Sequence, residues 1–240
     1  MTRMLYREDA YLTEAPGTVV AHTEEGGLVL DQSLFYPTGG GQPGDSGTLL
    51  VAGARRLPIA TAVRGTDGRI VLVPAEPVTL PPVGTELVQR LDWDRRFRHM
   101  RVHTALHLLS VLIPLPVTGG AIGAAKGRLD FDMPDGETDR DGLEAALNEL
   151  IDQDHPVSER WITDAELAAQ PELVKTMSVR PPTGAGRVRL IHIGEEDDQI
   201  DLQPCGGTHV ARLGEIGGIR VGKVENKGRR NRRVNIHLDT

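Results

Sequence analysis

Two short motifs, far apart in the chain, supply four side chains of the kinds that bind zinc. His103 and His107 are spaced i, i+4, so on a helix both imidazoles lie on one face and can share an ion. Cys205 and His209 flank a Gly-Gly pair, which allows a tight turn that brings both side chains to one point. Ligation by cysteine and histidine favours zinc over a hard cation. The four residues therefore predict a zinc site.

Each of these residue types also has an ordinary role in packing, because a lone histidine or cysteine is usually a core residue. Two paired motifs with no second cysteine make a metal site the favoured interpretation. A thiol nucleophile, Cys205 with His209 or His107 as its base, is the alternative. It is weaker, because the cysteine lies between expected strands and no helix start lowers its pKa. His99 lies on the same helical stripe and is interpreted as facing the substrate or supporting the ligands.

Basic residues are concentrated in two clusters although the chain has a net charge of −7. The net charge argues against a protein that coats nucleic acid by bulk electrostatics. A solvated surface is the alternative for each cluster, but two clusters around one metal site favour a phosphate-bearing substrate. The first cluster precedes the histidine motif and the second forms a hairpin loop: Arg95, Arg96, Arg98 and Arg101, then Lys223, Lys227, Arg229, Arg230, Arg232 and Arg233.

A glycine-rich segment covers residues 36–47. Its glycines match the dinucleotide fingerprint G-x-G-x-x-G, but Pro43 and a strand-like run follow where that fingerprint requires a helix. A mobile loop is one interpretation. Consecutive glycines beside polar side chains instead favour a backbone that approaches a ligand closely, with Gly39, Gly40, Gly41, Gln42 and Asp45 as the predicted contacts.

The pattern of turns and apolar residues predicts an α+β protein with two domains. Residues 1–90 read as short strands at 17–23, 27–30, 47–51, 59–63, 69–73 and 86–91, typical of a small β-barrel that carries the glycine-rich loop. Residues 91–240 read as helices on an antiparallel sheet, a two-layer arrangement. The expected elements there are helices at 95–113 and 141–153, a capping box at Thr163–Glu166, and strands at 187–193, 199–203, 219–225 and 233–238.

Composition places the chain among ordinary globular proteins, with 39% hydrophobic and 25% charged residues in 240. The single cysteine excludes an internal disulfide, and the first residues lack the apolar run of a signal peptide. We therefore expect a cytoplasmic protein. The apolar stretch at 106–117 is too short to span a bilayer, so no membrane association is expected.

Taken together, the three motifs resemble the editing domain of alanyl-tRNA synthetase. They are Phe-Tyr-Pro-Thr-Gly-Gly-Gly-Gln-Pro-Gly-Asp-Ser-Gly, His-Thr-Ala-Leu-His and Cys-Gly-Gly-Thr-His. The chain is more closely similar to the free-standing alanyl-tRNA editing proteins of the AlaX type, in their medium-sized form with the glycine-rich motif. It departs from the synthetase pattern at Leu106 and Ala125, where a threonine and a glutamine are frequent.

The resemblance implies a hydrolase that deacylates tRNA(Ala) mischarged with serine or glycine, with zinc as the cofactor. Zinc with three protein ligands would be catalytic, and zinc with four would orient the tRNA end. A tRNA-binding module with structural zinc and no turnover is the alternative. Thr104, Thr118 and Thr208 are the catalytic and hydroxyl-recognising candidates. Substrate contacts are expected from the glycine-rich loop and from Arg96, His99, Lys126, Arg229, Arg230, Arg232 and Arg233. The oligomeric state is not predicted.

Overall fold

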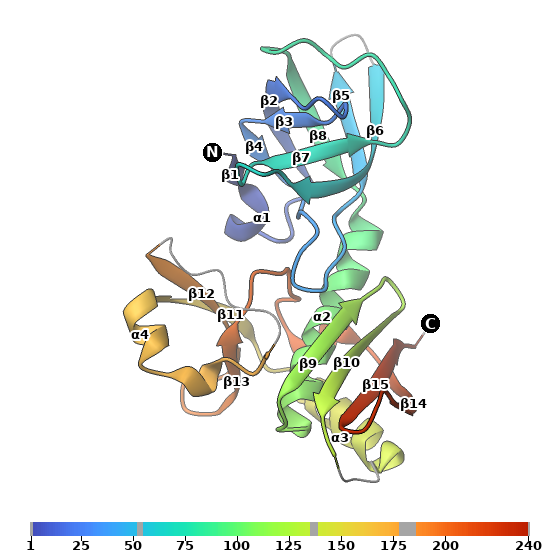
Figure 1. The fold of residues 1–240 in the computed structure, drawn as a ribbon, viewed down its shortest axis with the longest axis vertical. Coiled ribbons are helices and arrows are strands. Elements are labelled where there is room, and N and C mark those ends of the chain that lie inside the picture. The colour runs from blue at the N-terminus through green and yellow to red at the C-terminus, as the bar shows by residue number, and fades with distance from the viewer. Residues whose placement is uncertain (1, 52–54, 135–138, 178–185, 240) are drawn as a thin grey trace. The chain divides into compact units, whose positions relative to one another are not determined.

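The computed structural model describes residues 2–51, 55–134, 139–177 and 186–239 (Figure 1). The chain divides into two compact units, Met1–Phe97 and Arg98–Thr240. The division falls within the long helix α2, Trp93–Leu112. The predicted boundary, between residues 90 and 91, precedes the start of this helix.

Unit 1 is a closed barrel of antiparallel strands in the order β2-β3-β7-β6-β5-β8. Burial alternates along its strands: in β6, Leu57 and Ile59 are buried, while Arg56, Pro58 and Ala60 on either side of them are exposed. Closure leaves these strands without a free edge. Phe35, Leu49 and Leu72 lie in the barrel's core. The strands are β2 Glu14–His22, β3 Leu28–Leu30, β5 Gly47–Val51, β6 Arg55–Arg64, β7 Ile70–Pro74 and β8 Glu86–Leu91.

Three short elements of unit 1 were not predicted from the sequence. They are β1 Arg3–Met4, α1 Leu5–Glu8 and β4 Gln32–Ser33, and β1 pairs with β4 in parallel. A strand of two residues and a helix of one turn are too short to show a hydrophobic period, so the sequence carries no signal for them.

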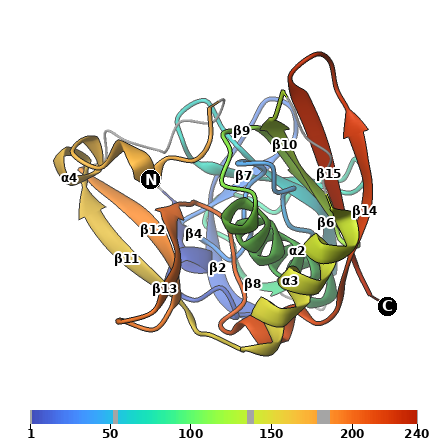
Figure 2. The same cartoon turned by 90° about the horizontal axis from the view of Figure 1, so that it is seen from below.

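Unit 2 contains two antiparallel sheets, one of four strands in the order β14-β15-β10-β9 and one of three in the order β11-β12-β13 (Figures 1 and 2). The first contains β9 Val117–Ile122, β10 Lys126–Asp132, β14 Ile219–Asn226 and β15 Asn231–Leu238. The second contains β11 Val157–Thr163, β12 Arg187–Gly194 and β13 Gln199–Pro204.

Within unit 2, helix α2 lies between these two sheets (Figure 2). On one side it meets Gly127 of β10, where a Cβ atom would lie 2.5 Å from Val102 Cγ1, so only glycine permits the close approach. On the other side His107 donates a hydrogen bond of 2.9 Å to Asp201 in β13. Both sheets thus fix the position of the histidine-bearing face.

Side chains cap the starts of the other two helices of unit 2, α3 and α4. Helix α3, Arg140–Asp152, begins where the Asp139 side chain accepts a 3.0 Å hydrogen bond from the Gly142 amide. Asn148 in α3 exchanges hydrogen bonds of 2.8 and 3.0 Å with the backbone of Ile219, which joins α3 to β14. The predicted capping box of Thr163 and Glu166 is confirmed at the start of α4, Asp164–Ala168. Two 3-10 turns, η1 Pro171–Leu173 and η2 Leu213–Ile216, complete the unit.

The predicted fold class, α+β with an N-terminal barrel and antiparallel sheets, is confirmed. The β9–β10 hairpin and strand β11 were not predicted. β9 contains two consecutive glycines, and β11 is exposed from Ser158 to Trp161, so neither shows the alternation of a half-buried strand. No helix in the described part of the chain is long and apolar enough to cross a membrane.

Candidate metal centre

One turn of α2 places the two predicted histidine ligands side by side. His103 and His107 are 7% and 6% exposed, and their ring centroids are 5.4 Å apart. This is the spacing that i, i+4 residues take on one helix face. His99, one turn earlier, is 1% exposed and therefore buried.

The other two predicted ligands lie in the loop that follows β13. Its start is fixed by a 3.2 Å hydrogen bond from the Cys205 amide to the Arg189 carbonyl. Its end is fixed by a 3.3 Å hydrogen bond from the Val210 amide to the Thr104 hydroxyl of α2. Within the turn, the Gly207 amide donates to the Cys205 sulfur at 3.4 Å. The loop is therefore tied to both the sheet and the helix.

Loop and helix bring all four side chains together. One ligand atom from each of His103, His107, Cys205 and His209 lies within 4.8 Å of the other three. The Cys205 Sγ lies 3.4 Å from His103 Nε2 and 3.3 Å from His209 Nε2. Bond lengths to tetrahedral zinc place its nitrogen and sulfur ligands about 3.3 to 3.6 Å apart. The donor set and the two distances from the Cys205 sulfur fit such an ion.

Neighbouring groups hold two of the imidazoles in the tautomer that a metal requires. The Thr104 hydroxyl donates its one hydrogen to the Met100 carbonyl at 2.9 Å, so His209 Nδ1, at 3.1 Å, must donate to the hydroxyl oxygen. His107 Nδ1 donates to Asp201 Oδ2 at 2.9 Å. In both rings Nε2 is then the nitrogen left to bind a metal, in His107 after loss of its proton.

Asp201 is a buried carboxylate with several partners. Lys175 Nζ and Gln203 Nε2 each donate to it at 2.6 Å, in addition to His107. Gln203 also donates to the Ser110 hydroxyl of α2 at 3.2 Å. Burial raises the pKa of Asp201, but the hydrogen bond and charge of His107 and the charge of Lys175 outweigh it and lower that pKa. The carboxylate stays ionised and anchors His107.

Electrostatics favour the ligating forms of Cys205 and His209. Burial opposes ionisation of the Cys205 thiol, but the charges of His103 and His209 outweigh it and hold the thiol's pKa well below its usual value. Burial and the charge of His103 hold the pKa of His209 well below its usual value. Burial lowers the pKa of His107, but hydrogen bonds to Asp201 and Cys205 overcome this and raise it to about 9. A metal must therefore displace a proton from His107.

Arg189 fastens the cysteine loop from the sheet side. Its Nη1 donates to the carbonyls of Cys205 and Gly207 at 3.0 and 2.8 Å, and its Nη2 pairs with Glu159. Arg189 is 7% exposed. This guanidinium fixes the backbone of the loop and leaves the Cys205 and His209 side chains for the site.

The glycine-rich segment of unit 1 forms a tight turn. Gly39 and Gln42 exchange backbone hydrogen bonds of 3.0 and 2.9 Å, and Gly40 and Gly41 between them have φ of 56° and 82°. Positive φ at both central residues is what a type I′ turn requires, and glycine adopts it freely. Gly40 and Gly41 are exposed, so their backbone is available to a ligand.

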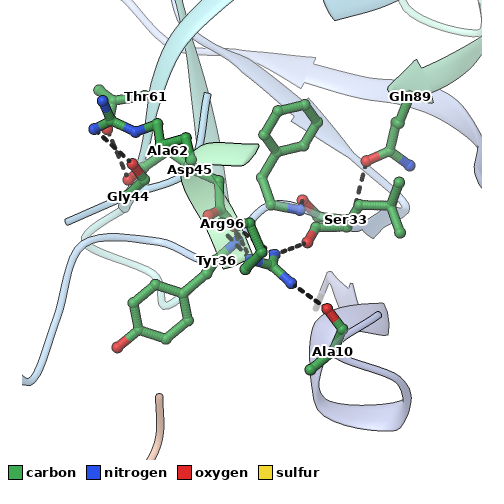
Figure 3. Close-up of polar contacts among 12 residues, drawn as sticks. Ala10, Ser33, Tyr36, Gly44, Asp45, Thr61, Ala62, Gln89 and Arg96 are labelled. Atoms are coloured by element: carbon green, nitrogen blue, oxygen red, sulfur yellow. Dashed lines mark hydrogen bonds and ion pairs between the residues drawn. The ribbon is translucent and has the colours of Figure 1, made fainter. Parts of the chain in front are cut away.

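A buried ion pair of Arg96 and Asp45 lies where the two ends of this segment meet, at Tyr36 and Asp45 (Figure 3). Arg96 Nε donates to the Asp45 carboxylate at 3.0 and 2.9 Å, and both side chains are almost fully buried, at 0% and 1% exposure. The same guanidinium donates to the carbonyls of Ala10 and Leu34, at 2.9 and 2.7 Å. Asp45 also accepts from the Tyr36 amide at 2.6 Å. Every strong donor of Arg96 is thus directed to the interior.

Comparison with known proteins agrees with this geometry. A family model described as "Threonyl and Alanyl tRNA synthetase second additional domain" matches residues 188–235, which include Cys205 and His209. The alanyl-tRNA editing protein AlaX-M of Methanosarcina acetivorans is 32% identical over 254 residues, covering 99% of each chain. The chain belongs to the AlaX family of alanyl-tRNA editing proteins. The AlaX-M protein of Saccharolobus solfataricus is 34% identical over 238 residues and 98% of each chain. The alanine–tRNA ligase of Pyrobaculum calidifontis is 35% identical over 234 residues, which are 93% of this chain and 25% of the ligase.

In this AlaX family member, several predicted substrate contacts lie in the interior. Arg96 and Asp45 form the buried pair, and Gln42 and His99 are 0% and 1% exposed. These positions differ from the expectation of side chains that face a ligand. Charged and polar residue types predict exposure on average, but the fold can satisfy them internally, as Asp45 does for Arg96.

The three predicted threonines occupy different surroundings. Thr104 contacts the ligand His209. The Thr118 hydroxyl instead lies on the four-stranded sheet, with the Asp130 carbonyl at 3.1 Å and Asn231 Oδ1 at 3.0 Å as the two acceptors within reach of its single hydrogen. Thr208 is fully buried directly before His209. Lys126 is exposed at the start of β10.

The basic hairpin between β14 and β15 is partly neutralised by its own neighbours. Arg233 donates to Asp130 at 2.8 and 3.0 Å, and Arg230 donates to Asp132 at 3.0 and 2.9 Å. Arg229 forms no ion pair with another described residue and is exposed. The charge that this AlaX family member offers to an anion is therefore smaller than its sequence suggests.

Two groups that support the site were missed from the sequence. Asp201 and Gln203 precede Cys205 at intervals of two residues, so the period of a strand places all three on one face. That alternation was the available signal for Asp201. Arg189 lies in a different strand, and its contact with the cysteine loop depends on the pairing of β12 with β13, which no local pattern reveals.

Proposed function

We propose that this chain hydrolyses the ester that joins serine to tRNA(Ala), with glycine as a second amino acid to test. The buried cysteine–histidine cluster, in a member of the alanyl-tRNA editing family, is the observation that carries the proposal. A pocket for alanine rejects serine or glycine by only about 1–3 kcal/mol, so accurate translation needs a second, hydrolytic selection.

We further infer that the cluster holds one zinc ion through His103, His107, Cys205 and His209. The support is the donor set, the spacing of the four ligand atoms and the tautomers that Thr104 and Asp201 impose. Bound zinc would supply a fixed positive charge that orients the ester-bearing end of the tRNA. The chain's own residues hold the ligands: Asp201 orients His107, Thr104 orients His209, and Arg189 fixes the backbone that carries Cys205.

The threonine roles follow from what their hydroxyls already touch. The hydroxyl of Thr104 is shared among the Met100 carbonyl, His209 and the Val210 amide, so we assign it to ligand positioning. We retain Thr208 as the candidate for recognising the seryl hydroxyl, because it directly precedes His209. Its test is Thr208→Val, which keeps the shape and removes the hydroxyl, and the readout is the ratio of rates on serine and alanine esters.

Contacts with the tRNA phosphates are proposed for groups that have exposed surface. These are the backbone of the turn at Gly39–Gly41 in unit 1 and, in unit 2, Lys126, Arg229 and Arg232. Arg96, Asp45 and Gln42 are assigned instead to holding the segment that carries the turn. Gly39 offers a clean test, because an added Cβ would lie 3.6 Å from its nearest neighbour and Gly39→Ala leaves the fold intact.

The decisive experiment measures deacylation of matched Ser-tRNA(Ala) and Ala-tRNA(Ala) by the zinc-loaded protein. We expect the serine ester to be cleaved at least tenfold faster, because a site that hydrogen-bonds the seryl hydroxyl leaves polar groups unpaired when alanine binds. Equal rates on both esters would overturn serine editing. Tight tRNA binding with no cleavage of serine, glycine or alanine esters would instead indicate a binding module with structural zinc.

The same assay separates the zinc site from a thiol hydrolase. Cys205 lies within 3.4 Å of two imidazoles, an arrangement that would also suit an activated thiol. A zinc site predicts that a strong chelator abolishes cleavage and that added zinc restores it. Full activity in the zinc-free protein, lost on alkylation of Cys205, would favour the thiol.

A further inference from the structure

Trp161 is an unusual aromatic residue in a chain that has only eight tryptophan, tyrosine and phenylalanine residues in total. Among the described residues of these three types it alone is exposed, at 42%. The other tryptophan, Trp93, packs in unit 1 with ring centroids 5.4 and 5.3 Å from Tyr11 and Phe97. An indole that stays at the surface is available to a partner.

Strand register places Trp161 on the same face of its sheet as the metal centre. Trp161 in β11 lies directly opposite Arg189 in β12. Leu190 pairs with Pro204 in β13, so the next pair along is Arg189 with Cys205, joined by the 3.2 Å hydrogen bond. Residues directly opposite each other in antiparallel strands point to one face. Cys205, Arg189 and Trp161 therefore form a row across the sheet.

Both faces of the central strand β12 are buried, and the opposite face packs against α4. Leu167 of α4 contacts Val188 and Leu190 there, with Ile162 and Leu202 at the margin. On the face of the row, Arg189 is covered, while Trp161, at the edge strand, is open. Two strand spacings separate the backbones of Cys205 and Trp161, roughly 10 Å. That is about three stacked nucleotides at 3.4 Å each.

The charge beside the ring suits a nucleic acid. The Arg187 guanidinium lies over the indole, 5.7 Å from its centroid, and Arg187 is exposed. The acidic residues on this face are both paired, Glu159 with Arg189, and Asp201 with His107 and Lys175. Arg187 forms no ion pair with another residue that the structure describes. An aromatic face next to such a cation is the combination that binds unpaired nucleotides, through stacking on the base and attraction to the phosphate.

We propose that Trp161 and Arg187 form a stacking platform for an unpaired nucleobase of the tRNA acceptor end, which fixes the strand while its esterified terminus lies at the metal centre. The inference rests on the proposed function, since it assigns the site a single-stranded RNA end as its ligand. Stacking on an aromatic side chain contributes about 1–3 kcal/mol per base and tolerates any base. The platform positions the strand, and Thr208 is left to recognise the amino acid.

Tryptophan fluorescence tests the platform directly. In a Trp93→Phe variant, Trp161 is the single tryptophan of the chain. The probes are uncharged tRNA(Ala) with its complete 3′ end and the same tRNA with its unpaired 3′ nucleotides removed. We expect the complete tRNA to quench Trp161 emission and the truncated tRNA to leave it unchanged. Equal effects of the two RNAs, or no change with either at saturating concentration, would overturn the proposal.

Substitutions provide the second measurement. We expect Trp161→Ala to raise the KM for Ser-tRNA(Ala) roughly 5- to 150-fold with little change in kcat. Trp161→Phe should retain most of the affinity, and Arg187→Ala should lose part of it. Arg160→Ala is the matched control, because Arg160 is exposed at the neighbouring position of the same strand and points to the other face.

An unchanged KM in Trp161→Ala overturns the platform alone if serine esters are still cleaved. Quenching without cleavage of any ester would leave the platform in place and overturn the editing function.

Discussion

Two loops, one in each unit, are held by a buried arginine, and they differ in what the arginine leaves available. Arg96 binds the carbonyls of Ala10 and Leu34 and the carboxylate of Asp45, where the two ends of the glycine-rich segment meet. Arg189 binds the carbonyls of Cys205 and Gly207 and pairs with Glu159. Both guanidiniums hold a backbone in place by donating to its carbonyl groups, for which a planar group with five N–H donors is well suited.

The difference lies in the partner carboxylate and in the side chains of the loop. Asp45 belongs to the loop itself and is 1% exposed. In unit 1 the loop's carboxylate is therefore paired in the interior, and the part of the loop left exposed is the backbone of the turn. Glu159 comes from another strand, and its side chain is 35% exposed. The cysteine loop therefore keeps its functional side chains for the metal centre. The buried Arg96 of unit 1 thus holds only the backbone of its own loop. The buried Arg189 of unit 2 holds the loop backbone and leaves the side chains of Cys205 and His209 for the metal centre.

The largest effect is expected from removing the ligand that the second loop supplies. Cys205→Ala should reduce zinc from about one ion per chain to a trace and lower the melting temperature, because bound zinc favours the folded state. The matched control is Gly206→Ala, since a Cβ there meets nothing within 4 Å and should leave zinc bound. Elemental analysis measures both. Full zinc occupancy in Cys205→Ala would remove this residue from the ligand set.

Breaking the buried pair should affect unit 1 and leave the metal centre unchanged. Arg96→Met abandons the Asp45 carboxylate in the interior, which is expected to cost about 3–5 kcal/mol of unfolding free energy. Adding Asp45→Asn should recover part of this loss, because a buried amide is less costly than an unpaired carboxylate. Urea unfolding is followed by Trp93 fluorescence in a Trp161→Phe background, with Arg95→Met as the control on the same helix. Equal stability of Arg96→Met and Arg95→Met would show that the pair is not structural.

These two loops also show which parts of the fold and of the site could be predicted from the sequence. The i, i+4 histidines and the Cys-Gly-Gly-Thr-His turn predicted a shared site, and the structure brings the four side chains together because helical period and glycine flexibility are local properties. The barrel followed in the same way from turns and alternating strands such as β6.

What the sequence could not provide was the internal pairing of charges. Arg96 belongs to a run of four arginines that resembles a solvated surface, and its partner Asp45 is 51 residues away in the sequence. Asp201 and Lys175 similarly meet only once β13 and the segment after η1 are in place. Long-range pairing of this kind is set by the tertiary fold, whereas composition and period are local.

The pH dependence of zinc binding tests His107, the ligand of the metal centre whose pKa is raised. The pKa of His107 is raised to about 9 in the metal-free site, so below that pH a proton competes with zinc. Lowering the pH from 9 to 7 should therefore weaken apparent zinc affinity by roughly tenfold per unit. Competition with a chromophoric chelator measures it. Asp201→Asn keeps an acceptor for His107 but removes the carboxylate charge that raises this pKa, so it should flatten the profile and weaken binding at pH 9 about 10- to 100-fold. An affinity independent of pH in the native chain would contradict the assignment of His107.

The smallest effect concerns charges at the hairpin, where paired and available arginines lie close together. Arg233 donates two hydrogen bonds to Asp130 and is 23% exposed, so an acidic partner neutralises its charge, as Asp45 neutralises that of Arg96. Arg229 is exposed and has no acidic partner among the described residues. If Arg229 binds a phosphate, Arg229→Ser should reduce the slope of log affinity against log salt by about one. Arg233→Ser should change that slope by less than half as much and lower stability instead, because it removes one of the two arginines that pair with Asp130. The measurement is tRNA binding at several salt concentrations for both variants, with zinc content as the control. Equal changes in slope would mean that internal pairing does not decide which arginines serve the tRNA.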